Sequence, residues 1–102
     1  MREIEWHPEA GAEFKSSGRH YERQLVGLGA RFGQAILTAI INAADDPRRY
    51  QHIDMCCQII RVKRFPYSVI YQEIARGIRI VAVMHHHRRP GYWQDRVGTW
   101  PA

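Results

Sequence analysis

The sequence has little cysteine and no long hydrophobic run. Its only two cysteines are the neighbours Cys56 and Cys57, and a disulfide between them would be a strained ring far from ordinary bridge geometry. Reduced thiols are typical of a cytosolic protein. The longest apolar stretches, residues 35–44 and 78–84, are about half of the roughly 20 residues that a membrane-spanning helix needs. The sequence therefore predicts no membrane span.

Motifs for several common chemistries are also absent. There is no phosphate-binding loop, no dinucleotide-binding glycine pattern and no Gly-x-Ser-x-Gly turn, so nucleotide-dependent, redox and acyl-transfer enzymes lose their usual signals. A metal site would have to use His52, Cys56, Cys57, His85 and His87, which show neither CxxC nor HExxH spacing. The first residues carry mixed charge and lack the apolar segment of a secretory signal. We expect a cytoplasmic protein with no metal and no other cofactor.

The charge of the chain is unevenly distributed. Its 102 residues are 45% hydrophobic, which predicts one domain over residues 1–102 with a modest core. Residues 1–47 hold five basic and seven acidic groups, whereas residues 48–102 hold ten basic and three acidic groups. Clustered positive charge is typical of a protein that binds a polyanion. A solvated basic face or an acidic protein partner explains the same pattern.

Hydrophobic periodicity divides the chain into strands and helices. Alternation at every second residue predicts four strands, at residues 2–7, 59–65, 67–72 and 78–84. Apolar residues at helical spacing predict two helices, at residues 8–26 and between the Gly27–Gly29 break and Pro47. The last two strands are joined by a tight turn at residues 75–77, where Gly77 is able to take a positive φ.

This order of elements predicts an α+β fold. An amphipathic helical hairpin must bury its apolar side, and the sheet offers the only large apolar surface. We expect a twisted antiparallel β-sheet with the N-terminal helical hairpin packed on one face, in the order β-α-α-β-β-β. The strand at residues 78–84 should be central because it is apolar on both faces at its end. After it there is room for one short C-terminal helix before residues 99–102, which we expect to fray.

The densest group of reactive side chains is the segment that follows the last strand. In an extended chain His85 and His87 lie on one side and His86 on the other. Two imidazoles beside arginines could cleave RNA without metal: one would take the 2′-hydroxyl proton, an acid would protonate the leaving oxygen, and guanidinium groups would stabilise the phosphorane. Tyr92 and Trp93 would stack unpaired bases. A basic strand end that binds a protein is the alternative.

Two segments together resemble a known family. They are Phe65–Tyr71 and, further along the chain, Ile80–Trp93. Their pairing is similar to the RelE/ParE family of bacterial type II toxins, also called plasmid-stabilisation proteins. The Pro8 helix start, the Leu28-Gly29 break and the Asp46-Pro47 helix end are similar too, so the resemblance covers nearly the whole chain.

The resemblance implies a growth-arresting toxin that a cognate antitoxin neutralises by wrapping around it. An antitoxin with acidic residues would match residues 48–102, and apolar side chains of the helices would complete its binding site. The helix residues that we assign to antitoxin binding are Phe14, Tyr21, Leu25 and Phe32. Aromatic residues at these spacings also predict core packing between the helices.

The family divides by target, and the resemblance leaves the target open. RelE-type members cut mRNA on the ribosome; the catalytic candidates for that activity are Arg61, Lys63, His85, His87, Arg89 and Tyr92. The candidates for binding the nucleic acid or another target are Arg64, Arg88 and Trp93. Ser68, however, stands where the RelE pattern has an arginine, and serine supplies no permanent charge. ParE-type members inhibit DNA gyrase, and the sequence leans to that branch. A degenerate toxin that only binds its antitoxin is the third alternative.

Overall fold

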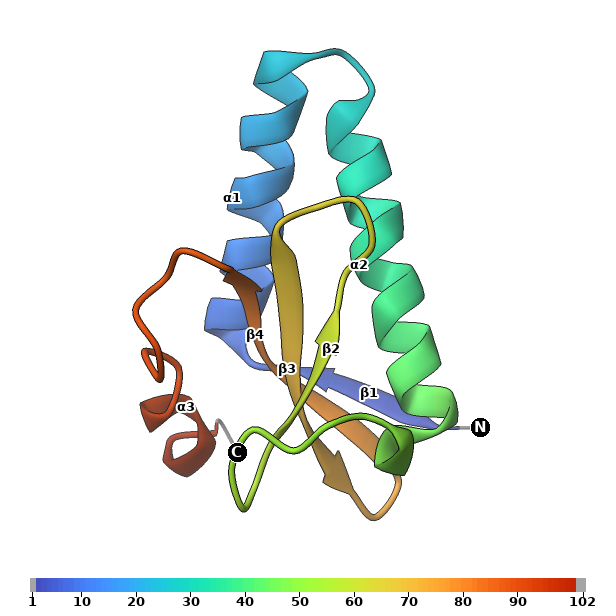
Figure 1. Ribbon diagram of the computed structural model, residues 1–102, viewed down its shortest axis with the longest axis vertical. Helices are drawn as coiled ribbons and strands as arrows, with labels where there is room; N and C mark the ends of the chain where they lie inside the picture. The colour runs from blue at the N-terminus through green and yellow to red at the C-terminus, as the bar shows by residue number, and fades with distance from the viewer. Residues whose placement is uncertain (1, 101–102) are drawn as a thin grey trace.

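The computed structural model describes residues 2–100 and has the predicted α+β fold and order of elements (Figure 1). The helical segments are α1 (Pro8–Gln24), α2 (Leu28–Asp45), the 3-10 turn η1 (Pro47–Arg49) and the short α3 (Asp95–Gly98). The strands are β1 (Glu3–Trp6), β2 (Gln58–Arg61), β3 (Tyr67–Ile74) and β4 (Gly77–His85). In Figure 1, α1 and α2 lie side by side and extend beyond the end of the sheet.

Local chemistry fixes where the two long helices begin and end. The His7 side chain caps α1, since its Nδ1 accepts the Glu9 N–H at 3.1 Å, and Pro8 occupies the first helical position, where no N–H is needed. Between the helices Gly27 has a φ of 89°. The Glu22 carboxylate accepts the N–H groups of Gly27 and Gly29 there. These groups would otherwise have no partner at the start of α2.

The sheet has the strand order β1-β4-β3-β2, so β4 is central as predicted. Strands β2, β3 and β4 form the predicted antiparallel meander, but β1 runs parallel to β4, from the pair Glu3 and Gly77 to the pair Trp6 and Ile80. The sheet is therefore mixed rather than wholly antiparallel. The alternation of polar and apolar residues predicts a strand but not its direction. No tight turn joins β1 to β4, so the sequence does not fix β1 as antiparallel.

The helix-facing side of the sheet is packed around Phe32. This ring is fully buried and lies 4.8 Å from the Tyr67 ring and 5.1 Å from the Tyr21 ring, measured between centroids. Phe14 and Phe65 complete the aromatic cluster at 6.2 and 5.4 Å from Phe32. Such offset and edge-on pairs contribute beyond the area that they bury. The packing between helices predicted for Phe14, Tyr21 and Phe32 is confirmed.

The C-terminal segment covers the other side of the sheet. Trp93 is buried there in a cluster with Cys57, Ile70, Val81 and Ala82. The Trp100 ring packs on the same cluster, 5.2 Å from the His7 ring and 4.9 Å from the Arg79 guanidinium. Trp100 is thus packed against the sheet and the Thr99 hydroxyl donates to the Asp95 carbonyl at 2.9 Å, where we expected the chain to fray. Residues 101 and 102 lie outside the described residues. None of the helices within residues 2–100 has both the length and the apolar character needed to cross a bilayer.

Gly77 is required for close approach of two strands, not for an unusual φ. Its φ is not positive. A Cβ at this position would lie 2.7 Å from the Glu3 nitrogen and overlap the Glu3 carbonyl oxygen. We expect Gly77→Ala to displace β1 and to lower the free energy of unfolding by about 2 kcal/mol.

The matched control is Gly18→Ala, because a Cβ on Gly18 meets nothing within 4 Å in the interior of α1. This change should raise the free energy of unfolding by roughly 0.5–1 kcal/mol. Urea unfolding of both variants measures the difference. Equal stability of Gly77→Ala and the unmodified chain would contradict the close packing of β1 on β4.

Candidate functional site

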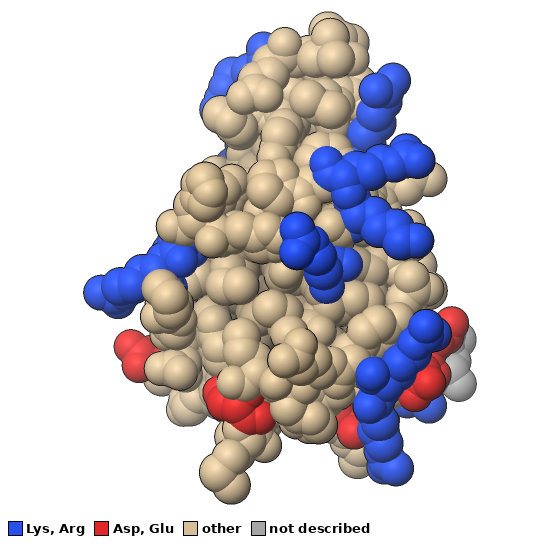
Figure 2. Space-filling view, viewed as in Figure 1, with Lys and Arg blue, Asp and Glu red and all other residues tan. Residues whose placement is uncertain are grey.

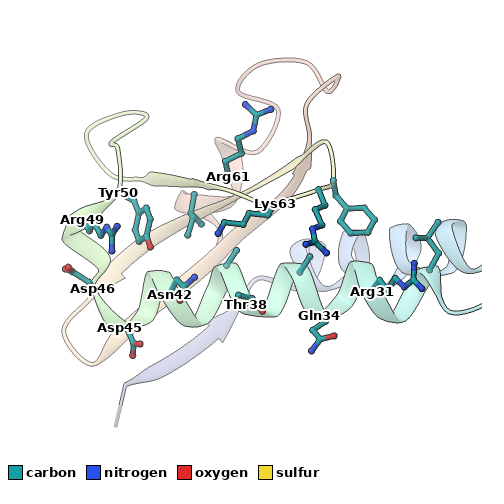
Figure 3. A pocket seen from close by; sticks show the side chains of 16 residues that line it. Arg31, Gln34, Thr38, Asn42, Asp45, Asp46, Arg49, Tyr50, Arg61 and Lys63 are labelled. Atoms are coloured by element: carbon teal, nitrogen blue, oxygen red, sulfur yellow. The ribbon is translucent and has the colours of Figure 1, made fainter.

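A basic groove lies between α2 and the end of β2, with a cavity volume of about 1010 Å³. Its floor is formed by small or apolar side chains, Ala35, Ala39, Ile60 and Phe65, and the alanines leave space between the helix and the strand. Its walls carry five basic side chains, Arg31, Arg49, Arg61, Lys63 and Arg64. Acidic side chains are confined to Asp45 and Asp46, at the end near η1 (Figure 3). We call this set of residues the basic groove.

A strained turn brings two of these cations into place. The prediction of a strand through Phe65 is wrong, because β2 ends at Arg61. The chain then turns, with the Val62 N–H donating to the Tyr67 carbonyl at 3.0 Å and with Arg64 at a φ of 72°. Arg64 is the only non-glycine residue with a positive φ among the residues that the structure describes. In Figure 3, Lys63 extends into the basic groove, whereas Arg61 points away from α2.

Basic side chains dominate one side of the molecular surface. In Figure 2, which has the orientation of Figure 1, Lys and Arg gather on the side along which α2 runs, and Asp and Glu lie towards the lower end. The uneven distribution of charge along the sequence thus becomes an uneven distribution in space. An acidic partner would meet an attractive potential on this side.

The second candidate surface is the turn at residues 85–89, which we call the histidine turn. The His85 ring lies 5.0 Å from the Tyr67 ring and 5.1 Å from the His87 ring, and the His87 N–H donates to His85 Nδ1 at 3.0 Å. His86 lies apart from this pair, since its Nε2 is 3.0 Å from Ser68 Oγ. Burial lowers the pKa of His85, and neighbouring His87 and His86 lower it further. Because Nδ1 accepts the His87 N–H, a neutral His85 carries its proton on Nε2.

Ser68, which the resemblance aligns with a strand arginine of RelE-type nucleases, is enclosed by the sheet. The serine is buried on β3, opposite Met84 of β4, and its hydroxyl is paired with His86. Arg61 is the register partner of Ser68 on β2 and is exposed. On the histidine turn itself, Arg88 and Arg89 are exposed.

Tyr92 and Trp93 are held within the protein. The Tyr92 hydroxyl donates to Glu13 Oε2 at 2.7 Å, and burial together with this carboxylate raises the pKa of Tyr92. The Trp93 side chain is only 2% exposed. The predicted use of Trp93 as a stacking surface does not fit this burial, and the Tyr92 phenol is committed to a carboxylate.

The helix residues assigned to antitoxin binding differ in exposure. Phe32 is fully buried and Phe14 and Tyr21 are partly buried, while Leu25 is 57% exposed. A binding role does not fit Phe32. Leu37 and Ile41, which were not predicted to bind a partner, are exposed apolar residues one turn apart on α2. Their spacing of four residues was the signal that would have identified them.

The cysteines and histidines form no metal site. Among residues 2–100 no three His, Cys, Asp or Glu side chains are grouped so that they would hold a metal ion. Cys56 is exposed and Cys57 is buried. Burial, with nearby Asp54 and Cys56, raises the pKa of Cys57 to about 12, which keeps this thiol protonated and unreactive.

Comparison with known proteins identifies the class. Residues 4–90 match the family model described as the ParE toxin of type II toxin-antitoxin system, parDE. The fold and this match define a toxin of a type II toxin–antitoxin system. The chain belongs to the ParE toxin family, and the resemblance drawn from its sequence is confirmed.

A solved structure shares the fold. It is the chromosomal ParDE TA system from P. aeruginosa, with a TM-score of 0.69 and 17% sequence identity over 83% of this chain and 96% of that chain. None of the curated proteins compared with this chain matches it.

The strain at Arg64 predicts how this position responds to glycine. A side chain in the left-handed region costs about 1 kcal/mol, which glycine does not incur. The larger backbone entropy that glycine loses on folding, roughly 0.5–1 kcal/mol, offsets part of this gain, so we expect Arg64→Gly to leave the free energy of unfolding unchanged or to raise it by up to about 0.5 kcal/mol. The neighbouring control Lys63→Gly, at a residue without a positive φ, should lower it by roughly 0.5–1 kcal/mol. Urea unfolding compares the two, and an equal loss of stability in Arg64→Gly and Lys63→Gly would refute the strain.

Proposed function

We propose that this ParE-family toxin arrests growth in the cytoplasm by inhibiting DNA gyrase. The observation that carries the proposal is that Ser68 is buried and paired with His86. Where a RelE-type nuclease has a guanidinium, this chain has a buried hydroxyl bonded to His86. Phosphoryl transfer without a metal needs such cations to stabilise the developing charge. The histidine turn, with exposed Arg88 and Arg89, is better suited to binding a target than to cleaving RNA.

The alternative is cleavage of ribosome-bound mRNA, and one observation favours it. His85 and His87 lie in contact on one side of the turn. In a nuclease, one imidazole would take the 2′-hydroxyl proton, which for His85 requires release of its Nδ1 from the His87 N–H, and an acid would supply a proton to the leaving oxygen. Arg61, Lys63 and Arg89 would stabilise the phosphorane. A chain that only binds its antitoxin is the remaining alternative.

The partner that we propose for the basic groove is an acidic segment of the cognate antitoxin. The groove combines an apolar floor with five cations, and an amphipathic segment with carboxylates along one side matches both features. Exposed Leu37 and Ile41 on the neighbouring side of α2 extend the apolar area that such a segment would cover.

The target is tested by inducing the protein without its antitoxin in a bacterial host. We expect growth arrest within minutes, messenger RNA with no new 5′ ends, and inhibition of supercoiling by purified gyrase. New ends at codon-phased positions inside translated regions would contradict gyrase as the target and establish the nuclease. An absence of arrest would leave a protein that only binds its antitoxin.

Two triple variants separate the target surface from the antitoxin surface. His85→Ala, His87→Ala and Arg89→Ala together should abolish growth arrest and leave the affinity for the antitoxin unchanged, because all three residues lie in the histidine turn. The matched set Arg31→Ala, Lys63→Ala and Arg64→Ala removes three cations from the basic groove. It should weaken antitoxin binding by roughly tenfold or more. Undiminished arrest by the histidine-turn variant would remove that turn from the target surface.

A further inference from the structure

One edge of β4 is left without a strand over its second half. β1 pairs with β4 only as far as Trp6 and Ile80, yet β4 continues to His85. Two side chains take the place of the missing strand. Glu13 of α1 accepts the Val83 N–H at 3.0 Å, and Arg96 of α3 donates to the Val81 carbonyl at 3.1 Å. Buried backbone groups that would otherwise lack partners are thereby satisfied.

Glu13 and Arg96 are also paired with each other. The Arg96 Nη1 and Nη2 atoms lie 2.9 and 3.0 Å from the two carboxylate oxygens of Glu13, a bidentate arrangement. The exposed fractions of the two side chains are 8% for Arg96 and 15% for Glu13. The pair is thus largely removed from solvent, where its hydrogen bonds are strong and its geometry is tightly fixed.

The same carboxylate reaches the histidine turn through Tyr92. The Tyr92 hydroxyl donates to Glu13 at 2.7 Å, which fixes the orientation of the ring. The Arg88 guanidinium lies over that ring, 3.9 Å from its centroid, and its Nη1 is 4.0 Å from Glu13 Oε2. At its other end the turn is held by the His86 N–H, which donates to the Pro66 carbonyl at 2.9 Å.

We propose that Glu13 and Tyr92 are positioning residues for growth arrest, because they hold Arg88, and with it the histidine turn, in the conformation that engages the target. The inference rests on the proposed function as a toxin. The Glu13–Arg96 pair by itself closes the edge of β4, so the contacts to Tyr92 and Arg88 are additional to what the fold requires. A charged side chain that is already oriented loses less conformational entropy when it binds.

The decisive variants are Glu13→Gln and Tyr92→Phe. Glu13→Gln removes the charge that holds Arg96, Arg88 and the Tyr92 hydroxyl. Tyr92→Phe keeps the ring and the Glu13–Arg96 pair and deletes one hydrogen bond, so it remains folded if Glu13→Gln does not. We expect the inducer dose for half-maximal growth arrest to rise about threefold for Tyr92→Phe and at least tenfold for Glu13→Gln, at equal protein levels. Amide hydrogen exchange should become faster in residues 85–92 of both variants.

The matched control is Glu22→Gln, the same loss of charge on the same helix. Glu22 caps the turn between α1 and α2 and touches no part of the histidine turn. This control should lower the melting temperature and leave the dose for arrest unchanged. The antitoxin affinity of all three variants should equal that of the unmodified chain.

Three results overturn the inference. Arrest by Tyr92→Phe and Glu13→Gln at the unmodified dose shows that the turn needs no such support. If the variants lose antitoxin affinity together with growth arrest, they are generally destabilised and the positioning role is wrong. The same conclusion follows if Glu22→Gln also loses growth arrest. No arrest by the unmodified chain removes the proposed function itself, and this result is recognised before any variant is compared.

Discussion

Glu13 and Arg96 stand 83 positions apart in the chain and form a bidentate ion pair between α1 and the C-terminal segment. Both side chains also bind the backbone of β4. Without Glu13, Arg96 would keep only a longer contact, 3.8 Å from its Nε to Glu9, and breaking a buried pair of this kind costs roughly 3–5 kcal/mol. The C-terminal segment, which packs on the side of the sheet away from α1 and α2, depends on this ion pair. Its helix α3 has only four residues and cannot form a stable helix alone.

The basic groove and the histidine turn are joined by one short loop. Lys63 and Arg64 at the start of this loop line the groove, while the Pro66 carbonyl at its end binds the His86 N–H. Tyr67 then packs against His85. On the proposed function, an antitoxin segment in the groove would lie next to the turn that engages the target. The antitoxin would then neutralise the toxin by occupying the surface beside the histidine turn, without changing the conformation of that turn.

The features that depend on residues close together in the sequence could be predicted, and those that depend on distant residues could not. Periodicity gave the helices and strands, and apolar residues on both faces placed β4 in the centre of the sheet. The direction of β1 could not be predicted, since it depends on how the helical hairpin returns the chain to the sheet. The early end of β2 depends on Arg64 taking a φ that arginine seldom adopts. Glu13 and Arg96 were missed because nothing near either residue in the sequence indicates the other.

Several features of the free toxin cost stability and have no structural purpose of their own. Arg64 has a strained backbone, five cations line one groove, and Leu37 and Ile41 are exposed on α2. Strain of this kind persists where the surrounding structure imposes it and is concentrated at functional sites. All of these features lie on α2 or in the basic groove, the surface assigned to the antitoxin. The carboxylates of a partner would neutralise the repulsion among the groove cations, and its apolar side chains would cover Leu37 and Ile41. The stability that these features cost the free protein is therefore explained by selection for binding as well as for folding.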